Sequence, residues 1–228
     1  MERDKIWYLK KFNLFENISH DELENISDKV SDNEVKKRDI VYLEGDTGEN
    51  LYFLKKGRVK ISRVNEAGKE ITLTMLEPGE IFGELGLFDD QPRQTTATAL
   101  EDSLICMMRR ADFEQLMSNK PELGFKLSKL MGLRLRHFEN RIDDLIFRDV
   151  PSRLARLLLR LSEQHPIETE NGLKINIKLS QQELANLIGA TREMTSSVLN
   201  NFRKDGIISL ESKHIYIQDN KALRKIAG

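Results

Sequence analysis

Glycine is unevenly placed along this chain, and its placement constrains the fold more than any other feature. Seven of the 13 glycines fall between residues 45 and 86 of the 228. Between them lie short runs in which apolar residues alternate with polar ones, such as Leu51 with Phe53 and Ile71 with Leu73. Period-two runs cut by turn residues are typical of antiparallel sandwiches and barrels. We therefore expect a small antiparallel β-domain, with residues 97–108 as a further strand pair and residues 14–30 as a short helical stretch.

The hydrophobic period changes after residue 111. From Pro121 to Phe147 the chain contains no further proline, and five apolar residues recur at spacings of 4, 3, 4 and 3. This heptad pattern predicts one long helix with a seam along which two helices bury side chains. Such a helix can instead dock on its own β-domain, but charged residues flank this narrow seam and favour a partner helix. The residues expected in the dimer interface are Met131, Leu135, Phe138, Ile142 and Leu145.

A new helix is expected just after the long one. Asp149 is a plausible N-cap and Pro151 lies in the first turn. Leu154, Leu157, Leu158 and Leu161 form its apolar stripe. A turn at His165–Pro166 and a short strand pair around residues 174–179 are expected to follow.

Residues 180–204 predict a helix-turn-helix. Ser180 with Glu183 forms a capping box, Gly189 supplies the tight turn, and Thr191 caps a second helix. We expect Met194, Val198 and Phe202 to face inward, and residues 207–208 and 215–217 to flank residues 211–214 as a two-stranded wing. The outer face of the second helix is expected to carry Arg192, Glu193, Ser196, Ser197, Asn200 and Arg203.

The side chains at the start of this second helix suit DNA. Arg192 can donate two hydrogen bonds to guanine, and Glu193 can accept one from cytosine. Thr191 and Ser180, at helix N-termini, suit phosphate oxygens. A solvated Arg192–Glu193 charge pair is the alternative. The candidate DNA-binding residues are Ser180, Thr191, Arg192, Glu193, Ser196 and Ser197.

Charge and composition narrow the class further. Residues 148–228 carry 13 Lys and Arg against 9 Asp and Glu, whereas residues 1–147 carry 23 against 28. A basic rear part suggests a polyanionic partner, although ordinary surface scatter is the alternative. A single cysteine, Cys106, and four scattered histidines argue against a disulfide framework or a metal site. We expect Cys106 to be a small apolar strand residue without a redox role.

Several broad classes are not expected. No apolar run is long enough to span a membrane, and the first eleven residues lack the apolar core of a signal peptide. We therefore expect a cytoplasmic protein. We find no nucleophile motif, phosphate loop or acid–base pair, so we do not expect an enzyme.

Taken together, these segments resemble the cyclic-AMP receptor protein and fumarate–nitrate reduction regulator family of bacterial transcription factors. The most specific pieces are residues 44–62, 78–102, 147–159 and 191–208. The resemblance implies an α+β fold: a cyclic-nucleotide-binding-type antiparallel β-roll (1–115), a dimerisation helix (116–147) and a C-terminal winged helix-turn-helix (148–228). It also implies double-stranded DNA, a second copy of the chain and RNA polymerase as partners.

The resemblance also assigns a candidate ligand site. In members that bind cyclic AMP, a Gly-Glu-Leu segment places its glutamate on the ribose and a following arginine holds the phosphate. The matching residues are Gly83, Glu84 and Leu85, with Arg93 as the phosphate arginine. The serine that follows this arginine in the family is Gln94 here, and the adenine-binding Thr-Ser pair is Phe138–Glu139. These departures speak against cyclic AMP and leave another small ligand, or none, open.

The expected function is a homodimeric, sequence-specific regulator that reads an inverted repeat. Family members commonly have an arginine near the fifth position of the second helix that makes a third contact with the operator. The aligned residue here is Ser197, so a different operator or weaker discrimination at one base pair is expected. Two alternatives stay open: an effector-independent regulator controlled by abundance, and a ligand-binding signalling module without sequence-specific DNA recognition.

Overall fold

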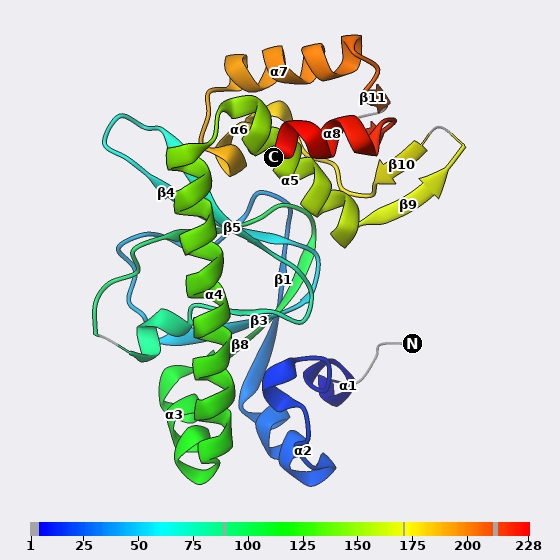
Figure 1. The fold of residues 1–228 in the computed structure, drawn as a ribbon. Helices are drawn as coiled ribbons and strands as arrows, with labels where there is room; N and C mark the ends of the chain where they lie inside the picture. Colours follow the sequence, from blue (N-terminus) through cyan, green and yellow to red (C-terminus); the bar gives the residue numbers. More distant parts are fainter. Residues whose placement is uncertain (1–4, 89, 171, 212–213) are drawn as a thin grey trace. The chain divides into compact units, whose positions relative to one another are not determined.

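The computed structural model describes residues 5–88, 90–170, 172–211 and 214–228, and the chain divides after Leu135 into two compact units (Figure 1). The boundary falls inside the long helix α4 (Pro121–Phe147). The heptad pattern predicted this helix, and the structure confirms it. The division into three functional parts, with boundaries near residues 115 and 147, stays a prediction.

The first unit is built on antiparallel strands, as expected. Two four-stranded sheets have the orders β1-β8-β3-β6 and β2-β7-β4-β5. Every pairing within them is antiparallel. Residues 97–108 supply two strands, as expected, but the two strands lie in different sheets and do not pair with each other, so the predicted strand pair is only partly correct. The strands are β1 (Val30–Val35), β2 (Ile40–Tyr42), β3 (Asn50–Lys56), β4 (Val59–Val64), β5 (Glu70–Leu76), β6 (Ile81–Phe82), β7 (Thr96–Ala99) and β8 (Ser103–Arg109).

Strand β3 is buried on both faces because its side chains alternate between two cores. Tyr52 and Leu54 face the core between the sheets, whereas Leu51 and Phe53 face a second core formed with helices. Cys106 of β8 lies in this second core, as the expected small apolar strand residue. The covering helices and turns are α1 (Lys5–Leu9), η1 (Asn13–Phe15), α2 (His20–Asp28), η2 (Glu84–Leu87) and α3 (Arg110–Asn119).

The helical stretch expected over residues 14–30 is only partly correct. The chain forms the 3-10 turn η1 and then α2, and residue 30 already begins strand β1. A capping box at Ser19 and Glu22 starts α2. The capping signal therefore divides the stretch into two helical pieces.

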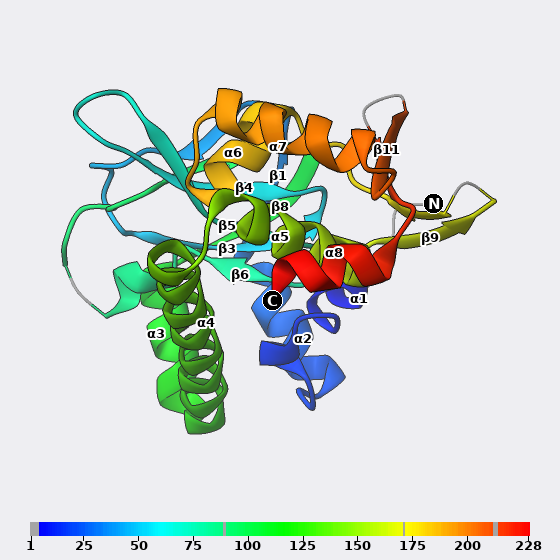
Figure 2. The same ribbon diagram turned by 45° about the horizontal axis from the view of Figure 1, so that its top comes forward.

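The second unit combines helices with a four-stranded sheet of order β11-β12-β10-β9 (Figures 1 and 2). The expected Asp149 cap is confirmed, since its side chain accepts a hydrogen bond from the Ser152 N–H at 2.9 Å. The elements are α5 (Val150–Gln164), β9 (Pro166–Thr169), β10 (Gly172–Ile175), α6 (Gln181–Ile188), α7 (Arg192–Lys204), β11 (Ile208–Glu211), β12 (His214–Ile217) and α8 (Asn220–Ala227).

The strand pair expected around residues 174–179 is misplaced. Strand β9 begins at Pro166 and pairs with β10, and the chain after Ile175 leaves the sheet. Proline is accommodated because β9 is an edge strand and Pro166 is its first residue, where no ladder N–H is required. The predicted wing is present as β11 and β12, but β12 also pairs with β10. Residues 212–213 of the wing lie outside the described residues.

Candidate nucleic-acid interface and effector site

Helix α6 begins with the capping box expected at Ser180. The Glu183 N–H donates to Ser180 Oγ at 3.2 Å, and the Ser180 N–H donates to Glu183 Oε2 at 2.6 Å. Gly189 ends the helix in a left-handed conformation with a φ of 66°, which L side chains rarely adopt. Leu184, Leu187 and Ile188 are buried as expected. These local contacts place the start of α7 directly after a tight turn.

Helix α7 begins at Arg192, and Thr191 is its N-cap. The Thr191 hydroxyl oxygen accepts a hydrogen bond from the Met194 N–H at 3.2 Å. Arg192 and Glu193 are both exposed, and neither side chain forms a hydrogen bond or ion pair with another described residue. The alternative of an Arg192–Glu193 charge pair therefore receives no support from the geometry. Both side chains are free to contact a ligand.

The expected inner face of α7 needs one correction. Phe202 is buried, but Met194 is 50% exposed, and the buried residues of the helix are Thr195, Leu199 and Phe202. A strict spacing of four drifts around a helix of 3.6 residues per turn, so the buried stripe alternates spacings of four and three. Met194 is thus an additional apolar side chain available on the first turns of α7, and only the 3.6-residue period could have indicated it.

The remaining candidate DNA contacts occupy the other side of α7. Ser197, Asn200 and Arg203 are exposed, whereas Ser196 is half-buried. The structure brings Thr191, Arg192, Glu193, Ser196 and Ser197 together over the first turns of one helix. Ser180 lies separately, at the N-terminus of α6.

The candidate ligand residues of the first unit also come together, but protein groups already contact them. Glu84 is buried and forms an ion pair with Arg134 of α4, with 2.6 Å between Oε1 and Nη1. Arg93 is 8% exposed and donates from Nη1 to the Gly83 carbonyl at 2.7 Å and from Nη2 to the Asn50 carbonyl. Leu85 and Gln94 are both exposed.

Aromatic rings surround the Arg93 guanidinium. Its central carbon lies 4.6 Å from the centre of the Tyr42 ring and 5.8 Å from that of Tyr52. Burial raises the pKa of both tyrosines, so both stay neutral donors. The Arg93 Nε is buried and has no hydrogen-bond partner among the described residues. Arg93 therefore retains one unused donor for an anionic group.

The sequence left two alternatives for the seam of α4: packing against a partner helix or docking on the β-domain of the same chain. Different parts of the helix agree with each alternative. Met131 packs partly against the core of the first unit, beyond the buried Leu123 and Leu127. The other four seam residues expose large apolar surfaces, up to 60% for Leu135. The N-terminal part of the helix therefore docks on its own β-domain, whereas Leu135, Phe138, Ile142 and Leu145 are uncovered.

Two other features are not found among the described residues. No group of three or more His, Cys, Asp or Glu side chains is placed to hold a metal ion. None of the described helices is both long and apolar enough to cross a bilayer.

A β-roll followed by a long helix and a winged helix-turn-helix defines a class of DNA-binding transcription regulators. A family profile for cyclic nucleotide-binding domains matches residues 32–120, and one for Crp-like helix-turn-helix domains matches residues 152–226. The chain belongs to the Crp/Fnr family of transcription regulators, which are not enzymes.

Relatives cover almost the whole chain. A CRP-like cAMP-activated global transcriptional regulator of Mycobacterium tuberculosis is 32% identical over 219 residues, 96% of this chain and 98% of that protein. The anaerobic regulatory protein of Bacillus subtilis is 33% identical over 89% of this chain and 84% of its own length. A structure of a CooA mutant from Carboxydothermus hydrogenoformans aligns with a TM-score of 0.76 at 26% identity, covering 90% of each chain.

Proposed function

We propose that this regulator binds an inverted-repeat operator as a homodimer and reads its sequence through the N-terminal end of α7. The observation that carries the proposal is that the side chains of Arg192 and Glu193 are exposed at the start of α7 and form no hydrogen bond or ion pair with the part of the chain that the structure describes. A recognition helix contacts base edges with side chains at this position. A bidentate arginine contact favours guanine, and a carboxylate favours cytosine.

The uncovered seam of α4 supports the homodimer. Leu135, Phe138, Ile142 and Leu145 recur with heptad spacing on one helix and remain exposed in the single chain. Exposed apolar residues with this spacing are buried when a second identical helix packs against them. A two-fold dimer presents two α7 helices to half-sites one helical turn of DNA apart, about 34 Å, or a multiple of it.

Control by a small anionic ligand in the β-roll is the second part of the proposal. The unused Arg93 Nε favours an anion, and Glu84 can accept from a ligand hydroxyl group if it leaves Arg134. Such a ligand would release the contact between Glu84 and α4 and so change how α4 is held. The relative from Mycobacterium tuberculosis is named as activated by cAMP, which makes a cyclic nucleotide the first ligand to test. RNA polymerase is the expected protein partner.

An effector-independent regulator is the competing proposal. The observation that favours it is that protein groups already hold both key residues, Glu84 through Arg134 and Arg93 through two backbone carbonyls. Operator affinity measured with and without cyclic nucleotides separates the two. A change in affinity supports gating, and an unchanged affinity across a range of small anions supports effector independence.

Selection of bound duplexes from a random pool tests the DNA-binding proposal. The expected product is a two-fold symmetric sequence with a conserved G·C pair in each half-site. Enrichment without any consensus would instead indicate the signalling module that lacks sequence-specific recognition.

A further inference from the structure

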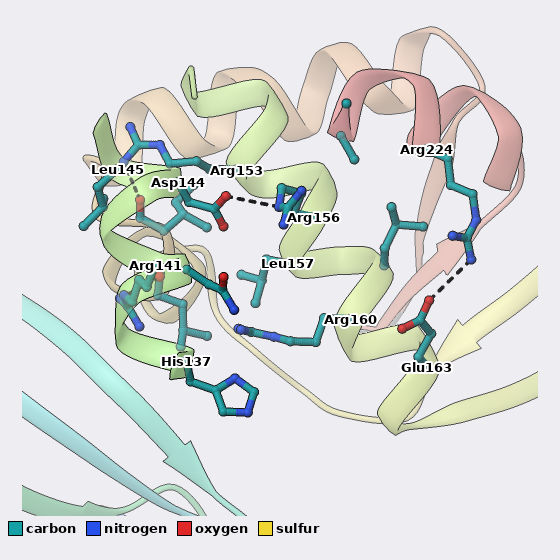
Figure 3. A pocket seen from close by; sticks show the side chains of 16 residues that line it. His137, Arg141, Asp144, Leu145, Arg153, Arg156, Leu157, Arg160, Glu163 and Arg224 are labelled. Carbon is teal, nitrogen blue, oxygen red and sulfur yellow. Dashed lines mark hydrogen bonds and ion pairs between the residues drawn. The ribbon is translucent and has the colours of Figure 1, made fainter. Parts of the chain in front are cut away.

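A basic pocket lies inside the second unit, apart from α7 (Figure 3). Its volume is about 530 Å³, within the range of small-molecule sites. The C-terminal part of α4, α5, the end of α6 and the end of α8 line it, and no residue of α7 is among the described lining residues. The charged residues that line it are Arg141, Arg153, Arg156, Arg160, Arg224, Asp144 and Glu163.

Two of the five arginines contact neutral groups. Arg141 Nη2 donates to the Leu187 carbonyl at 2.8 Å, and Arg153 Nη1 donates to the Ile188 carbonyl at 2.7 Å. These carbonyls end helix α6, so each contact satisfies an acceptor that the helix leaves open. Neutral acceptors therefore help to orient both guanidinium groups.

The two carboxylates of the pocket already form ion pairs with arginines. Asp144 contacts both Arg148 and Arg156, at 3.0 Å and 3.2 Å, and Glu163 contacts Arg224 at 3.3 Å. Arg160 has no ion pair among the described residues. The pocket therefore holds more positive than negative charge, and a terminal carboxylate on Gly228, which also lines it, would leave the balance positive.

Burial, and to a smaller extent neighbouring positive charge, affects the arginines of this pocket. Desolvation, with a contribution from neighbouring Arg160, lowers the pKa of Arg141 to about 10. Desolvation also lowers the pKa of Arg160. The Arg153 Nε is buried without a hydrogen-bond partner. An anion in the pocket would accept from this donor and relieve the repulsion between the guanidinium groups.

We propose that this pocket binds a small polyphosphate anion, held by Arg141 from α4 and by Arg153 and Arg160 from α5. Planar guanidinium groups match phosphate oxygens with paired hydrogen bonds. Figure 3 shows Arg156 and Arg160 extending from α5 toward the C-terminal part of α4, where Arg156 contacts Asp144. A bridging anion would hold the angle between α4 and α5 at their junction. The proposal does not depend on how α7 reads DNA.

Calorimetric titration of the full-length protein with sodium tripolyphosphate at about physiological salt tests this site. We expect saturable binding with one anion per chain, weakened about tenfold or more by Arg160→Gln, since one charge-assisted contact is lost. The matched control is Arg136→Gln, which removes the same charge from an exposed residue of α4 outside the pocket. This control should bind tripolyphosphate like the unaltered protein.

Three further arms keep the result interpretable. Arg160→Lys keeps the charge and should recover part of the affinity, which separates lost charge from lost folding. Titration with ATP in place of tripolyphosphate shows whether the pocket accepts a phosphate chain that belongs to a nucleotide. The site is supported if Arg160→Gln weakens the binding of either anion. Absence of saturable binding, or equal weakening by Arg136→Gln, would overturn the proposal. So would anion binding lost in Arg203→Gln on α7 but kept in Arg160→Gln.

Discussion

At the scale of single residues, two arginines illustrate opposite uses of the same side chain. Arg93 is buried, and backbone carbonyls hold it beside two tyrosine rings. Arg192 is exposed on the first turn of α7, and its side chain has no hydrogen-bond or ion-pair partner within the described ranges. Protein groups hold the first in one orientation, whereas the second is free to adapt to a base edge in the proposed complex with DNA.

Arg192→Ala should remove discrimination at one G·C pair per half-site. Loss of a bidentate contact costs about 1–3 kcal/mol of base discrimination. The measurement compares affinity for the selected operator with affinity for a duplex in which that pair is A·T. Lys204→Ala, at the far end of α7, is the control and should weaken both duplexes equally. Equal weakening of both by Arg192→Ala would make Arg192 a phosphate contact only.

Cys106 should be unreactive in the folded protein. Burial, together with a hydrogen bond from Sγ to Asp32 Oδ1 at 3.0 Å, raises the pKa of the thiol to about 12. The nucleophilic thiolate is therefore scarce at neutral and mildly alkaline pH. Mass spectrometry after iodoacetamide treatment at pH 8 should show modification only once denaturant is added. Rapid stoichiometric alkylation of the native protein would contradict the burial of this residue.

At the scale of elements, the Asp149 cap positions the start of α5. The backbone hydrogen bond from Ser152 lowers the pKa of Asp149, so its charged form is favoured in the folded state. Asp149→Ala should lower the free energy of unfolding by about 1 kcal/mol at neutral pH. Stabilisation by a carboxylate with a lowered pKa is lost as the pH falls through that pKa. The difference in the free energy of unfolding between Asp149→Ala and the unaltered protein should therefore become smaller at acidic pH.

Urea unfolding at several pH values measures this effect. Asp149→Asn is the control, because an asparagine oxygen also accepts the Ser152 N–H and should keep most of the stability. A penalty for Asp149→Ala that did not change with pH would argue against a contribution from the charge.

The seam of α4 makes a second prediction at this scale. Ile142→Glu places a charge on an exposed seam residue, so the single chain should fold normally. In a dimer the symmetry would bury two unpaired carboxylates, which costs roughly 3 kcal/mol or more and weakens association about a hundredfold. Sedimentation equilibrium measures the dissociation constant. Asp143→Lys, beside the seam, should leave it nearly unchanged, and unaltered association of Ile142→Glu would refute the proposed interface.

Local signals explain how much of these elements could be predicted from the sequence. The capping box at Ser180, the Gly189 turn and the Thr191 cap each depend on residues within four positions, so the pattern alone placed α6 and α7. The pairing of β9 with β10 was missed because Pro166 resembles a turn residue unless the strand is known to lie at a sheet edge.

At the scale of the whole molecule, the candidate ligand site and the basic pocket depend on contacts between residues distant in sequence, which the sequence pattern alone does not predict. The ion pair between Glu84 and Arg134 and the bonds from Arg93 to the Gly83 and Asn50 carbonyls join residues far apart in the chain. The family resemblance identified Glu84 and Arg93 as candidates, but it could not show that protein groups already contact them. The basic pocket likewise collects arginines from separate helices, which no local pattern marks.

The most direct test of the central claim is the mass of the complex between the protein and its selected operator, measured by sedimentation equilibrium. Two chains on one duplex, with both half-sites of the inverted repeat required, is the expected result. A single chain on each duplex, with affinity unaffected when one half-site is scrambled, would contradict the paired recognition of DNA proposed for this regulator.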